Sequence, residues 1–275
     1  MSAAPLAGLR VLVTRPPGRA DELIAAIESA GGSAVHIPLL LVTPLNADRD
    51  AEIFAQTRQR ILDLDRYRRV IAISVNAAQY GLEWIDNYWP QLPSGIAWYG
   101  IGAATVAALA QRDIVAQSDS TPDKNTPDKN MKAAMNSEAL LALPALQHID
   151  GERILILRGV GGRETLASVL RERGAQVDYA ECYRRTEPNL SAAQQAQLQA
   201  LDIDAICANS QETLQNLWQC LTPAARPRAQ HCALIVPSAR VAAAAHALGF
   251  ARVVAAANAG TPATLDALRG IAAIN

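Results

Sequence analysis

Residues 9–31 read LRVLVTRPPGRADELIAAIESAG, and this stretch decides the fold. It begins with Arg10–Thr14, a branched apolar run that has the length of a buried strand. Leu23, Ile24 and Ile27 then form one face of a helix, and Gly31 stands where a helix end favours positive φ. A strand, a short turn and an amphipathic helix in this order predict a β-α-β unit with parallel strands.

The same pattern returns in the second half of the chain. Residues 152–174 read ERILILRGVGGRETLASVLRERG, so that Arg15 falls on Arg158 at an offset of 143. A second, weaker repeat, at an offset of 135, relates residues 99–104 (YGIGAA) to residues 234–239 (LIVPSA). Two divergent copies are too few for a solenoid. The sequence therefore predicts two similar α/β domains.

Short apolar runs alternate with longer amphipathic stretches along the rest of the chain. This rhythm is typical of parallel sheets that helices cover on both faces. The predicted strands are Arg10–Thr14, Ala34–Ile37, Val70–Ser74, Ile96–Tyr99, Ile114–Ala116, Ile154–Leu157, Gln176–Ala180, Ala205–Ala208, Ala233–Val236 and Arg252–Ala255.

The composition suits a folded protein of two domains. The chain has 275 residues, of which 50% are hydrophobic and 19% are charged, and its formal net charge is -1. These values exclude a largely disordered chain and argue against a general binder of nucleic acids or membrane surfaces. No apolar run approaches the ~18 residues of a membrane helix, and the N-terminus lacks the regions of a signal peptide.

The cysteines give no sign of a disulfide framework or a metal site. Cys182, Cys207, Cys220 and Cys232 form no CxxC pair and lie in apolar surroundings. His231 precedes Cys232, but no second ligand pair supports zinc. The pattern favours buried free thiols, and we expect a reducing cytoplasm.

One segment departs from the α/β rhythm. Residues 121–125 and 126–130 repeat the pentapeptide TPDKN, which is polar and contains Pro. We predict an exposed loop over residues 117–136, and we interpret it as a tolerated insertion rather than a functional lid.

Polar and Gly-rich turns follow several predicted strands. Gly100-Ile-Gly102 resembles a dinucleotide fingerprint, but Thr105 stands at the place of the third Gly and no acidic residue follows at the expected strand end. Similar turns into helices occur at residues 74–76, 159–162, 209–210 and 237–238. Main-chain N–H groups at such turns bind carboxylates, and parallel strands bring the turns to one edge of a sheet. The pattern indicates anion capture by the main chain.

Few side chains carry a recognisable catalytic signature. The chain has no GxSxG, HExxH, Walker A or Cys–His motif. Arg15 and Arg158 end equivalent strands, and each either clamps a carboxylate or pairs at the surface with a nearby helix. Tyr183 follows a strand beside Arg184 and Arg185, and it is either a proton or hydrogen-bond donor or a half-buried aromatic residue.

Five short segments stand in a distinctive order and spacing. They are VLVTRP at 11–16, YGIGAAT at 99–105, SEALL at 137–141, ILRGVGGRE at 156–164 and ECYRR at 181–185. Together they resemble the uroporphyrinogen-III synthase family over nearly the whole chain. The resemblance implies two α/β domains joined by two extended linker strands, near Pro38–Pro44 and Tyr183–Pro188, with the ligand cleft between them. One discontinuous domain would comprise residues 1–37 and 184–275, and an inserted domain residues 38–183.

The resemblance also implies a reaction. Linear hydroxymethylbilane loses its hydroxyl group, the substituted carbon of the last pyrrole attacks, and a spiro intermediate rearranges to uroporphyrinogen III. Without an enzyme the linear tetrapyrrole closes to isomer I, and that ring is not inverted. No metal or organic cofactor is implied. The substrate is rich in carboxylates, which suits main-chain turns and Arg, and catalysis lies chiefly in folding it into one geometry.

By the same resemblance, Tyr183 is the catalytic residue that assists loss of the hydroxyl group. Substrate binding is expected from residues at turns and strand ends, namely Thr14, Arg15, Ser74, Thr105, Arg158, Gly159, Ser210 and Ser238. The chain departs from the residues common in the family at Val160 and Arg240. We expect a monomer that acts on a small molecule and has no nucleic-acid or membrane partner.

Two other classes of protein are also compatible with this sequence. A non-catalytic two-domain hinge protein that binds an anionic metabolite would share the architecture, and binding without turnover would distinguish it. A nucleotide-dependent oxidoreductase is disfavoured by the incomplete Gly motif, and purified protein without nicotinamide or flavin would count against it.

Overall fold

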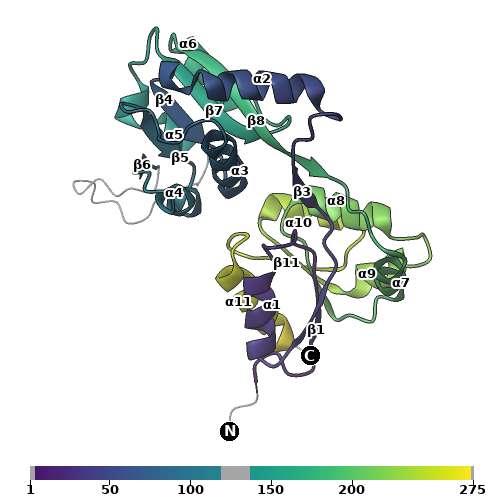
Figure 1. Cartoon of the computed structure of the whole chain (residues 1–275). Coiled ribbons are helices and arrows are strands. Elements are labelled where there is room, and N and C mark those ends of the chain that lie inside the picture. Colours follow the sequence, from purple (N-terminus) through teal and green to yellow (C-terminus); the bar gives the residue numbers. More distant parts are fainter. Residues whose placement is uncertain (1–3, 119–136, 274–275) are drawn as a thin grey trace, which may run out of the picture. The chain divides into compact units, whose positions relative to one another are not determined.

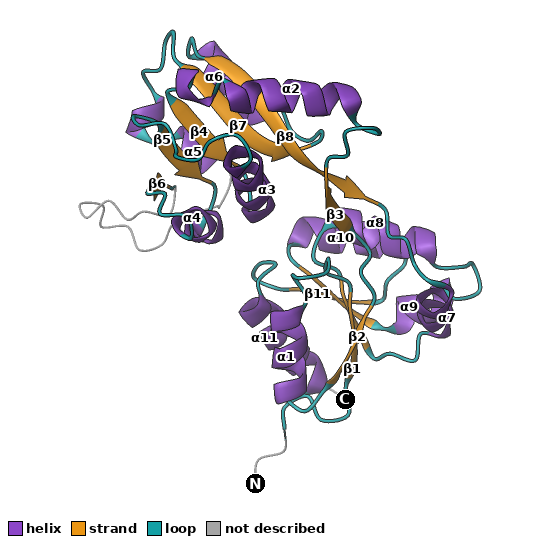
Figure 2. Ribbon diagram, in the orientation of Figure 1, coloured by secondary structure: helices purple, strands orange, loops and turns teal. Residues whose placement is uncertain are grey.

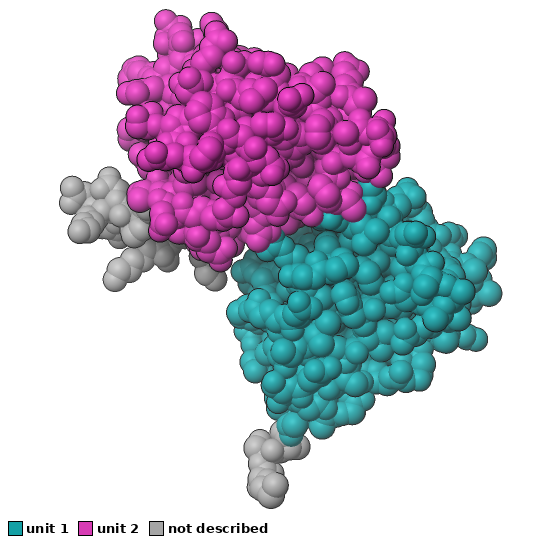
Figure 3. All heavy atoms as spheres, viewed as in Figure 1, with its two compact units in different colours: residues 1–42, 186–275 teal, residues 43–185 magenta. Residues whose placement is uncertain are grey.

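The computed structural model describes residues 4–118 and 137–273. The chain divides into two compact units: Met1–Val42 and Thr186–Asn275 form unit 1, and Thr43–Arg185 form unit 2 (Figure 3). Each unit carries its own sheet with helices packed on it (Figures 1 and 2). The predicted loop at 117–136 lies, from residue 119 onward, outside the described residues.

Unit 1 is built on a five-stranded sheet in the order β11-β10-β9-β1-β2. Its strands are β1 (Arg10–Val13), β2 (Ser33–His36), β9 (Ala205–Cys207), β10 (Ala233–Val236) and β11 (Arg252–Ala255). All of its strand pairings are parallel. The stretch at residues 9–31 forms β1 and helix α1 (Asp21–Ser29), as its pattern predicts.

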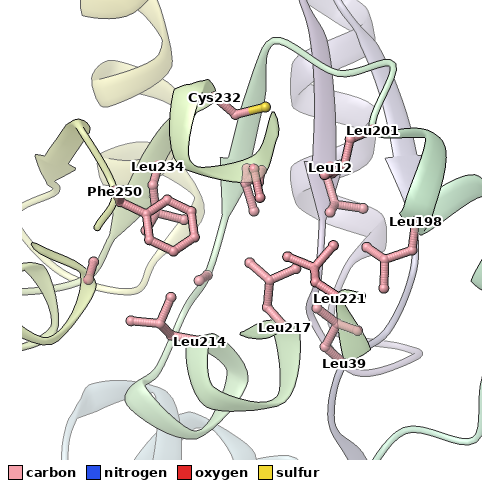
Figure 4. Close-up of a cluster of buried hydrophobic side chains, with 14 of the residues drawn as sticks. Leu12, Leu39, Leu198, Leu201, Leu214, Leu217, Leu221, Cys232, Leu234 and Phe250 are labelled. Atoms are coloured by element: carbon pink, nitrogen blue, oxygen red, sulfur yellow. The ribbon is translucent and has the colours of Figure 1, made fainter. Parts of the chain in front are cut away.

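Helices pack on both faces of this sheet. Besides α1 they are α7 (Ala192–Ala200), α8 (Gln211–Cys220), α9 (Arg226–His231), α10 (Ala239–Ala247) and α11 (Thr261–Ala272). On one face, Leu12 of β1 belongs to a buried cluster with Leu217 of α8 (Figure 4). On the other face, Val11 and Val13 pack with Leu268 of α11. Successive residues of β1 thus enter different cores, as the alternation of a strand requires.

Unit 2 is built on a six-stranded sheet in the order β3-β8-β7-β4-β5-β6. Its strands are β3 (Leu41–Pro44), β4 (Arg69–Ala72), β5 (Ala97–Gly100), β6 (Ala116–Gln117), β7 (Arg153–Gly159) and β8 (Gln176–Thr186). The pairings among β4 to β8 are parallel. The strands β3 and β8 contain the points at which the chain passes from one unit to the other.

The helices of unit 2 also pack on its sheet. They are α2 (Ala51–Leu62), η1 (Leu64–Arg66), α3 (Val75–Asp86), α4 (Ala103–Ala110), α5 (Ser137–Leu141), η2 (Pro144–Leu146) and α6 (Thr165–Glu172). Ile71 and Ile156 of the sheet share one core with Leu170 of α6. Helix α3 approaches β7 so closely that a Cβ atom on Gly81 would lie 2.6 Å from Leu157. This close packing requires Gly at that position.

The two sheets share one strand order, which confirms the prediction of two similar parallel-sheet α/β domains. Unit 1 runs β2-β1-β9-β10-β11, and unit 2 runs β8-β7-β4-β5-β6 in the corresponding direction. Strand β1 thus corresponds to β7 and β10 to β5, as the two sequence offsets predict. The direction of chain progress reverses between β1 and β9 and between β4 and β7. Ligands of open α/β sheets bind at such switch points, outside the carboxyl ends of the strands.

Among the predicted strands, β10 and β11 have the predicted bounds, and the others differ at one or both ends, all but β8 by no more than two residues. Strand β6 comprises Ala116–Gln117 instead of Ile114–Ala116, and Val115 is 93% exposed. Strand β8 continues past the predicted end at Ala180, because its pairing with β7 persists through a register shift at Arg158/Gly159. The shift pairs Gly159 with Tyr183. Tyr183 therefore lies within a strand rather than after one.

Candidate active site

A pocket of about 410 Å³ lies in unit 2 at the carboxyl ends of β4, β5 and β7 and beside β8. It occupies the switch point between β4 and β7. Its lining residues are Ile73, Ser74, Ile101, Ser137, Ile156, Arg158, Gly159, Gly161, Gly162, Arg163, Leu166, Tyr179, Tyr183 and Arg185. Of the predicted site residues, the pocket brings together Ser74, Arg158, Gly159 and Tyr183.

The charged side chains that line this pocket are of one sign. Arg158, Arg163 and Arg185 contribute guanidinium groups, and the described lining residues include no Asp or Glu. Gly161 and Gly162 form a turn with φ values of 72° and 109°, so that main chain rather than side chain faces the space there. The pocket is therefore suited to an anionic ligand.

The phenol hydroxyl of Tyr183 contacts a second predicted site residue, Ser74. Its oxygen lies 3.3 Å from Oγ of Ser74, and either atom can donate the hydrogen bond. Its ring stacks on Tyr80, with centroids 5.3 Å apart, and the residue is only 5% exposed. Packing on both sides fixes the ring, so the hydroxyl has one well-defined position in the pocket.

Gly159 makes room for this tyrosine. A Cβ atom on Gly159 would lie 2.6 Å from Cε2 of the Tyr183 ring, closer than two carbon atoms can pack. The role that the structure supports for Gly159 is therefore the close approach of β7 to the Tyr183 ring.

Ser74 is oriented by the helix that it begins. It is the N-cap of α3, and its Oγ accepts a hydrogen bond from the N–H of Ala77 at 3.1 Å. An N-cap serine keeps its hydroxyl at the helix start, because the side chain satisfies an N–H that has no partner within the helix. The hydroxyl is thereby held beside Tyr183.

Arg158 is buried, at 2% exposed. Its Nη1 lies 3.0 Å from Oε1 of Glu164, and the guanidinium also donates to the carbonyl groups of Gly159 and Gly161. The group stands 4.4 Å from the centre of the Tyr179 ring. Arg158 therefore pairs with the start of α6, as one predicted alternative had it, but in a buried site rather than at the surface, and the predicted contact with a ligand carboxylate stays a prediction. Arg158 also anchors the turn that follows β7.

Glu164 and Tyr179 complete this ion-pair cluster. The hydroxyl of Tyr179 donates to Oε2 of Glu164 at 2.6 Å. This hydrogen bond and the nearby Arg158 lower the pKa of Glu164, whereas burial and the same hydrogen bond raise the pKa of Tyr179. Because the pKa of Glu164 is lower when folded, its stabilising contribution is present above the ordinary Glu range and is lost as pH falls through the lowered pKa.

Arg15 takes the equivalent place in unit 1 and is also buried, at 7% exposed. Its Nη1 lies 3.0 Å from Oγ1 of Thr261, and its Nη2 lies 2.8 Å from the carbonyl oxygen of Ala259. Burial lowers the pKa of the guanidinium. Arg15 therefore bonds to α11 and to the loop before it, as one predicted alternative had it, but in a buried site rather than at the surface.

The edge of unit 1 near Arg15 is filled rather than open. The cavity there measures about 10 Å³, which is near the minimum for one water molecule. Thr14 beside it is fully buried and donates its hydroxyl to the carbonyl of Cys207 at 2.6 Å, which ties β1 to β9. The expected substrate contact at Thr14 is not supported by this geometry.

Replacing Arg15 by Met will lower the free energy of unfolding by about 2 kcal/mol, because the carbonyl of Ala259 and the hydroxyl of Thr261 lose their donor in a buried site. Urea unfolding measures the change. Arg228→Met, at an exposed residue of α9, is the matched control and should stay within about 0.5 kcal/mol of the parent. Equal effects of the two substitutions would contradict an anchoring role for Arg15.

The remaining predicted residues are not among those that line this pocket. Ser210 and Ser238 are the N-caps of α8 and α10, and each accepts a hydrogen bond from the backbone N–H three residues on. Both stand at carboxyl ends of strands in unit 1, as the turn pattern predicts. Thr105 is only 2% exposed in the first turn of α4 and does not line the pocket.

Sequence comparison places this architecture among known proteins. A family model described as uroporphyrinogen-III synthase HemD matches residues 21–266 of the chain. The chain belongs to the uroporphyrinogen-III synthase family. The match reaches from α1 to α11, so this synthase family accounts for both units and confirms the predicted resemblance.

Individual synthases support the assignment. The uroporphyrinogen-III synthase of Escherichia coli K12 is 35% identical over 266 residues, which cover 95% of this chain and 100% of that protein. The uroporphyrinogen-III synthase of Proteus mirabilis is 31% identical over 210 residues, 76% of this chain and 97% of that protein. The solved structure of uroporphyrinogen-III synthetase from Helicobacter pylori gives a TM-score of 0.59 at 13% identity, covering 96% of this chain and 99% of that chain. A mutant synthase from Thermus thermophilus gives 0.56 at 16% identity, covering 96% and 97%. These structural likenesses support the fold.

The structure adds residues to this synthase site that sequence reasoning missed. Tyr179 and Arg163 line the pocket, and Tyr80 supports the Tyr183 ring. A signal for Tyr179 was available, because Tyr179 and Tyr183 stand at an even spacing, which places residues on one face of a strand. No such signal exists for Tyr80, whose contact arises only when α3 packs beside β8.

The cysteines of this synthase-family chain are free, as predicted. Burial raises the pKa of Cys207 to about 12 and raises that of Cys182 further, so neither thiol is a nucleophile near neutral pH. Within residues 4–118 and 137–273, no group of His, Cys, Asp and Glu residues could hold a metal ion. The same ranges contain no helix with the length and apolar character of a membrane span.

Proposed function

We propose that this chain catalyses the reaction of its family, the cyclisation of hydroxymethylbilane to uroporphyrinogen III with inversion of the last pyrrole ring and loss of water. The observation that carries the proposal is the pocket of unit 2, where arginines and a tyrosine hydroxyl meet and no carboxylate lines the described walls. A substrate rich in carboxylates suits this charge. The relatives that match 95% of the chain are named as this synthase, so a non-catalytic hinge protein is not favoured.

The size of the pocket suggests what it holds. Its 410 Å³ falls within the roughly 300–1,000 Å³ that encloses a small ligand. We therefore assign to it the hydroxymethyl-bearing end of the linear tetrapyrrole, where the first bond breaks. Enclosing that end keeps the reactive carbon away from bulk water and limits side reactions of the cation that forms.

Tyr183 is the residue that we assign to this first step. The C–O bond of the hydroxymethyl group breaks, its electron pair goes to oxygen, and the phenol of Tyr183 donates the proton that makes the leaving group water. Ser74 holds the hydroxyl in place at 3.3 Å. The substituted carbon of the last pyrrole attacks the cation to form the spiro intermediate, which then rearranges. The unsubstituted α-carbon of the inverted pyrrole closes the ring and loses its proton, and this proton restores the phenol, so the net change is the loss of one water molecule.

Further parts of the proposal follow from the family reaction and the turns. Ser210 and Ser238, with the N–H groups at the starts of their helices, bind other carboxylates of the substrate. The protein works as a cytoplasmic monomer without a cofactor and without a nucleic-acid or membrane partner.

The experiment that tests the function is product analysis with freshly generated hydroxymethylbilane. We expect isomer III to form faster than spontaneous isomer I and without added cofactor, as resolved by separating the uroporphyrins after oxidation. Heat-denatured protein gives the uncatalysed rate. Isomer I alone, at that rate, would overturn the proposal and return the non-catalytic hinge protein to first place.

A further inference from the structure

The turn of residues 160–163, between β7 and α6, forms one wall of the pocket but has little packing of its own. Gly161 and Gly162 carry no side chain and adopt positive φ. The backbone is held by polar contacts instead: the Gly161 carbonyl accepts from Arg158, and the Gly161 N–H donates to Oε1 of Glu181 at 2.9 Å. The position of this wall therefore depends on where the guanidinium of Arg158 points.

The direction of that guanidinium is set by a closed cluster of three side chains. Glu164 binds Arg158 through Oε1 and Tyr179 through Oε2, and the Tyr179 ring lies against the same guanidinium. Arg158 is almost fully buried, whereas the Glu164 side chain is 59% exposed. Glu164 does not line the pocket, although both of its partners do. It reaches the pocket only through them.

The cluster of Arg158, Glu164 and Tyr179 also determines whether Arg158 or Arg163 is available to a ligand. The N–H groups of Arg158 donate to Glu164 and to the carbonyl groups of Gly159 and Gly161, so this guanidinium already has protein acceptors. Arg163 lines the same wall, and within the described residues its side chain makes no ion pair or hydrogen bond. Of the two guanidinium groups near this turn, that of Arg158 in β7 faces protein acceptors, and that of Arg163 is left for an anion.

We propose that Arg163 binds a substrate carboxylate and that Glu164 is the positioning residue for it, acting through Arg158 and Tyr179 on the turn of residues 160–163. The proposal rests on the proposed function for the identity of the substrate. It differs from the sequence-based expectation, which gave the carboxylate contact on this turn to Arg158. Glu164 touches no substrate atom, and its effect is on binding rather than on the loss of hydroxide.

Steady-state kinetics of isomer III formation test the assignment. Arg163→Ala should raise KM about tenfold and change kcat less than about threefold, because it removes a binding contact remote from the leaving group. Glu164→Gln should raise KM by a similar factor. Glu172→Gln, at an exposed glutamate near the other end of α6, is the matched control and should leave both constants unchanged.

A double-mutant cycle separates positioning from a general structural effect. If Glu164 acts by placing Arg163, the double variant Arg163→Ala, Glu164→Gln should have the KM of the Arg163 single variant. Independent, multiplied effects of the two changes would overturn the positioning role. An unchanged KM in Arg163→Ala would overturn the binding role.

A binding measurement keeps the inference separate from the proposed function. Uroporphyrin III is a stable polycarboxylate that can be titrated while the intrinsic tryptophan fluorescence is followed. We expect its Kd to rise about tenfold in Arg163→Ala and in Glu164→Gln but not in Glu172→Gln. An unchanged Kd would refute this inference whatever the product analysis gives. A raised Kd in a protein that forms no isomer III would refute the function and leave the anion site standing.

Discussion

Tyr183→Phe is expected to lower kcat for isomer III formation about 100-fold, the lower end of what a positioned proton donor contributes. The substitution removes only the hydroxyl group that meets Ser74 in the pocket, and the ring keeps its stacking on Tyr80 and its contact with Gly159. Hydroxide is a poor leaving group, so loss of its proton donor slows the first step. KM should change little, since the carboxylate contacts remain.

The control for this prediction is Tyr67→Phe in the same unit. Tyr67 is 3% exposed and donates its hydroxyl to Oδ2 of Asp178 at 2.9 Å, but it does not line the pocket. Each substitution should cost about 1 kcal/mol of unfolding free energy for the lost hydrogen bond, measured by urea denaturation. The Tyr67 variant should keep the parental kcat. A Tyr183 variant with parental kcat would remove this residue from the mechanism.

The second large effect is expected from Gly159→Ala, which should lower kcat by about tenfold or more and destabilise the protein by roughly 1–3 kcal/mol. The added methyl would stand 2.6 Å from the Tyr183 ring. Because Tyr80 stacks on that ring, displacing the ring costs free energy of folding. Any displacement carries the hydroxyl away from Ser74. A misplacement of about 1 Å is enough to slow catalysis strongly.

Two further variants test whether Gly159 acts through Tyr183. Gly270→Ala, where a Cβ atom would meet nothing within 4 Å in α11, should raise stability by about 0.5–1 kcal/mol and leave kcat unchanged. The double variant Gly159→Ala, Tyr183→Phe should have the same kcat as Tyr183→Phe alone. A further loss in the double variant would mean that Gly159 affects catalysis by another route.

The fold could be predicted from the sequence because its signals are local. The apolar runs, the helix faces and each copy of the repeat that relates Arg15 to Arg158 lie within short windows, and each predicted strand is found. The turns at Ser74, Ser210 and Ser238 were predictable for the same reason, because an N-cap depends on its own helix. The end of β8 was not, since its pairing past Ala180 depends on a register shift against β7.

A residue of the site could be predicted only where its type and its place in the fold were enough to identify its role. Tyr183 lies in β8 and Ser74 begins the helix that follows β4, and the structure places their hydroxyl groups 3.3 Å apart. The part played by Arg158 could not be inferred, because it depends on burial and on the reach of Glu164. A strand-end arginine has the same sequence signature whether its partner is a ligand or its own loop.

The two buried arginines have a consequence for engineering the protein. Each unit has a buried arginine at the equivalent strand end, and its guanidinium needs hydrogen-bond acceptors. The two units supply these acceptors from different segments. In unit 1 the acceptors come from the loop before α11 and the start of that helix, which close the edge to about 10 Å³. In unit 2 they come from the following turn and from Glu164, and about 410 Å³ stays open. To carve a second binding pocket into unit 1, a designer would have to move the partners of Arg15 from α11 to the turn after β1.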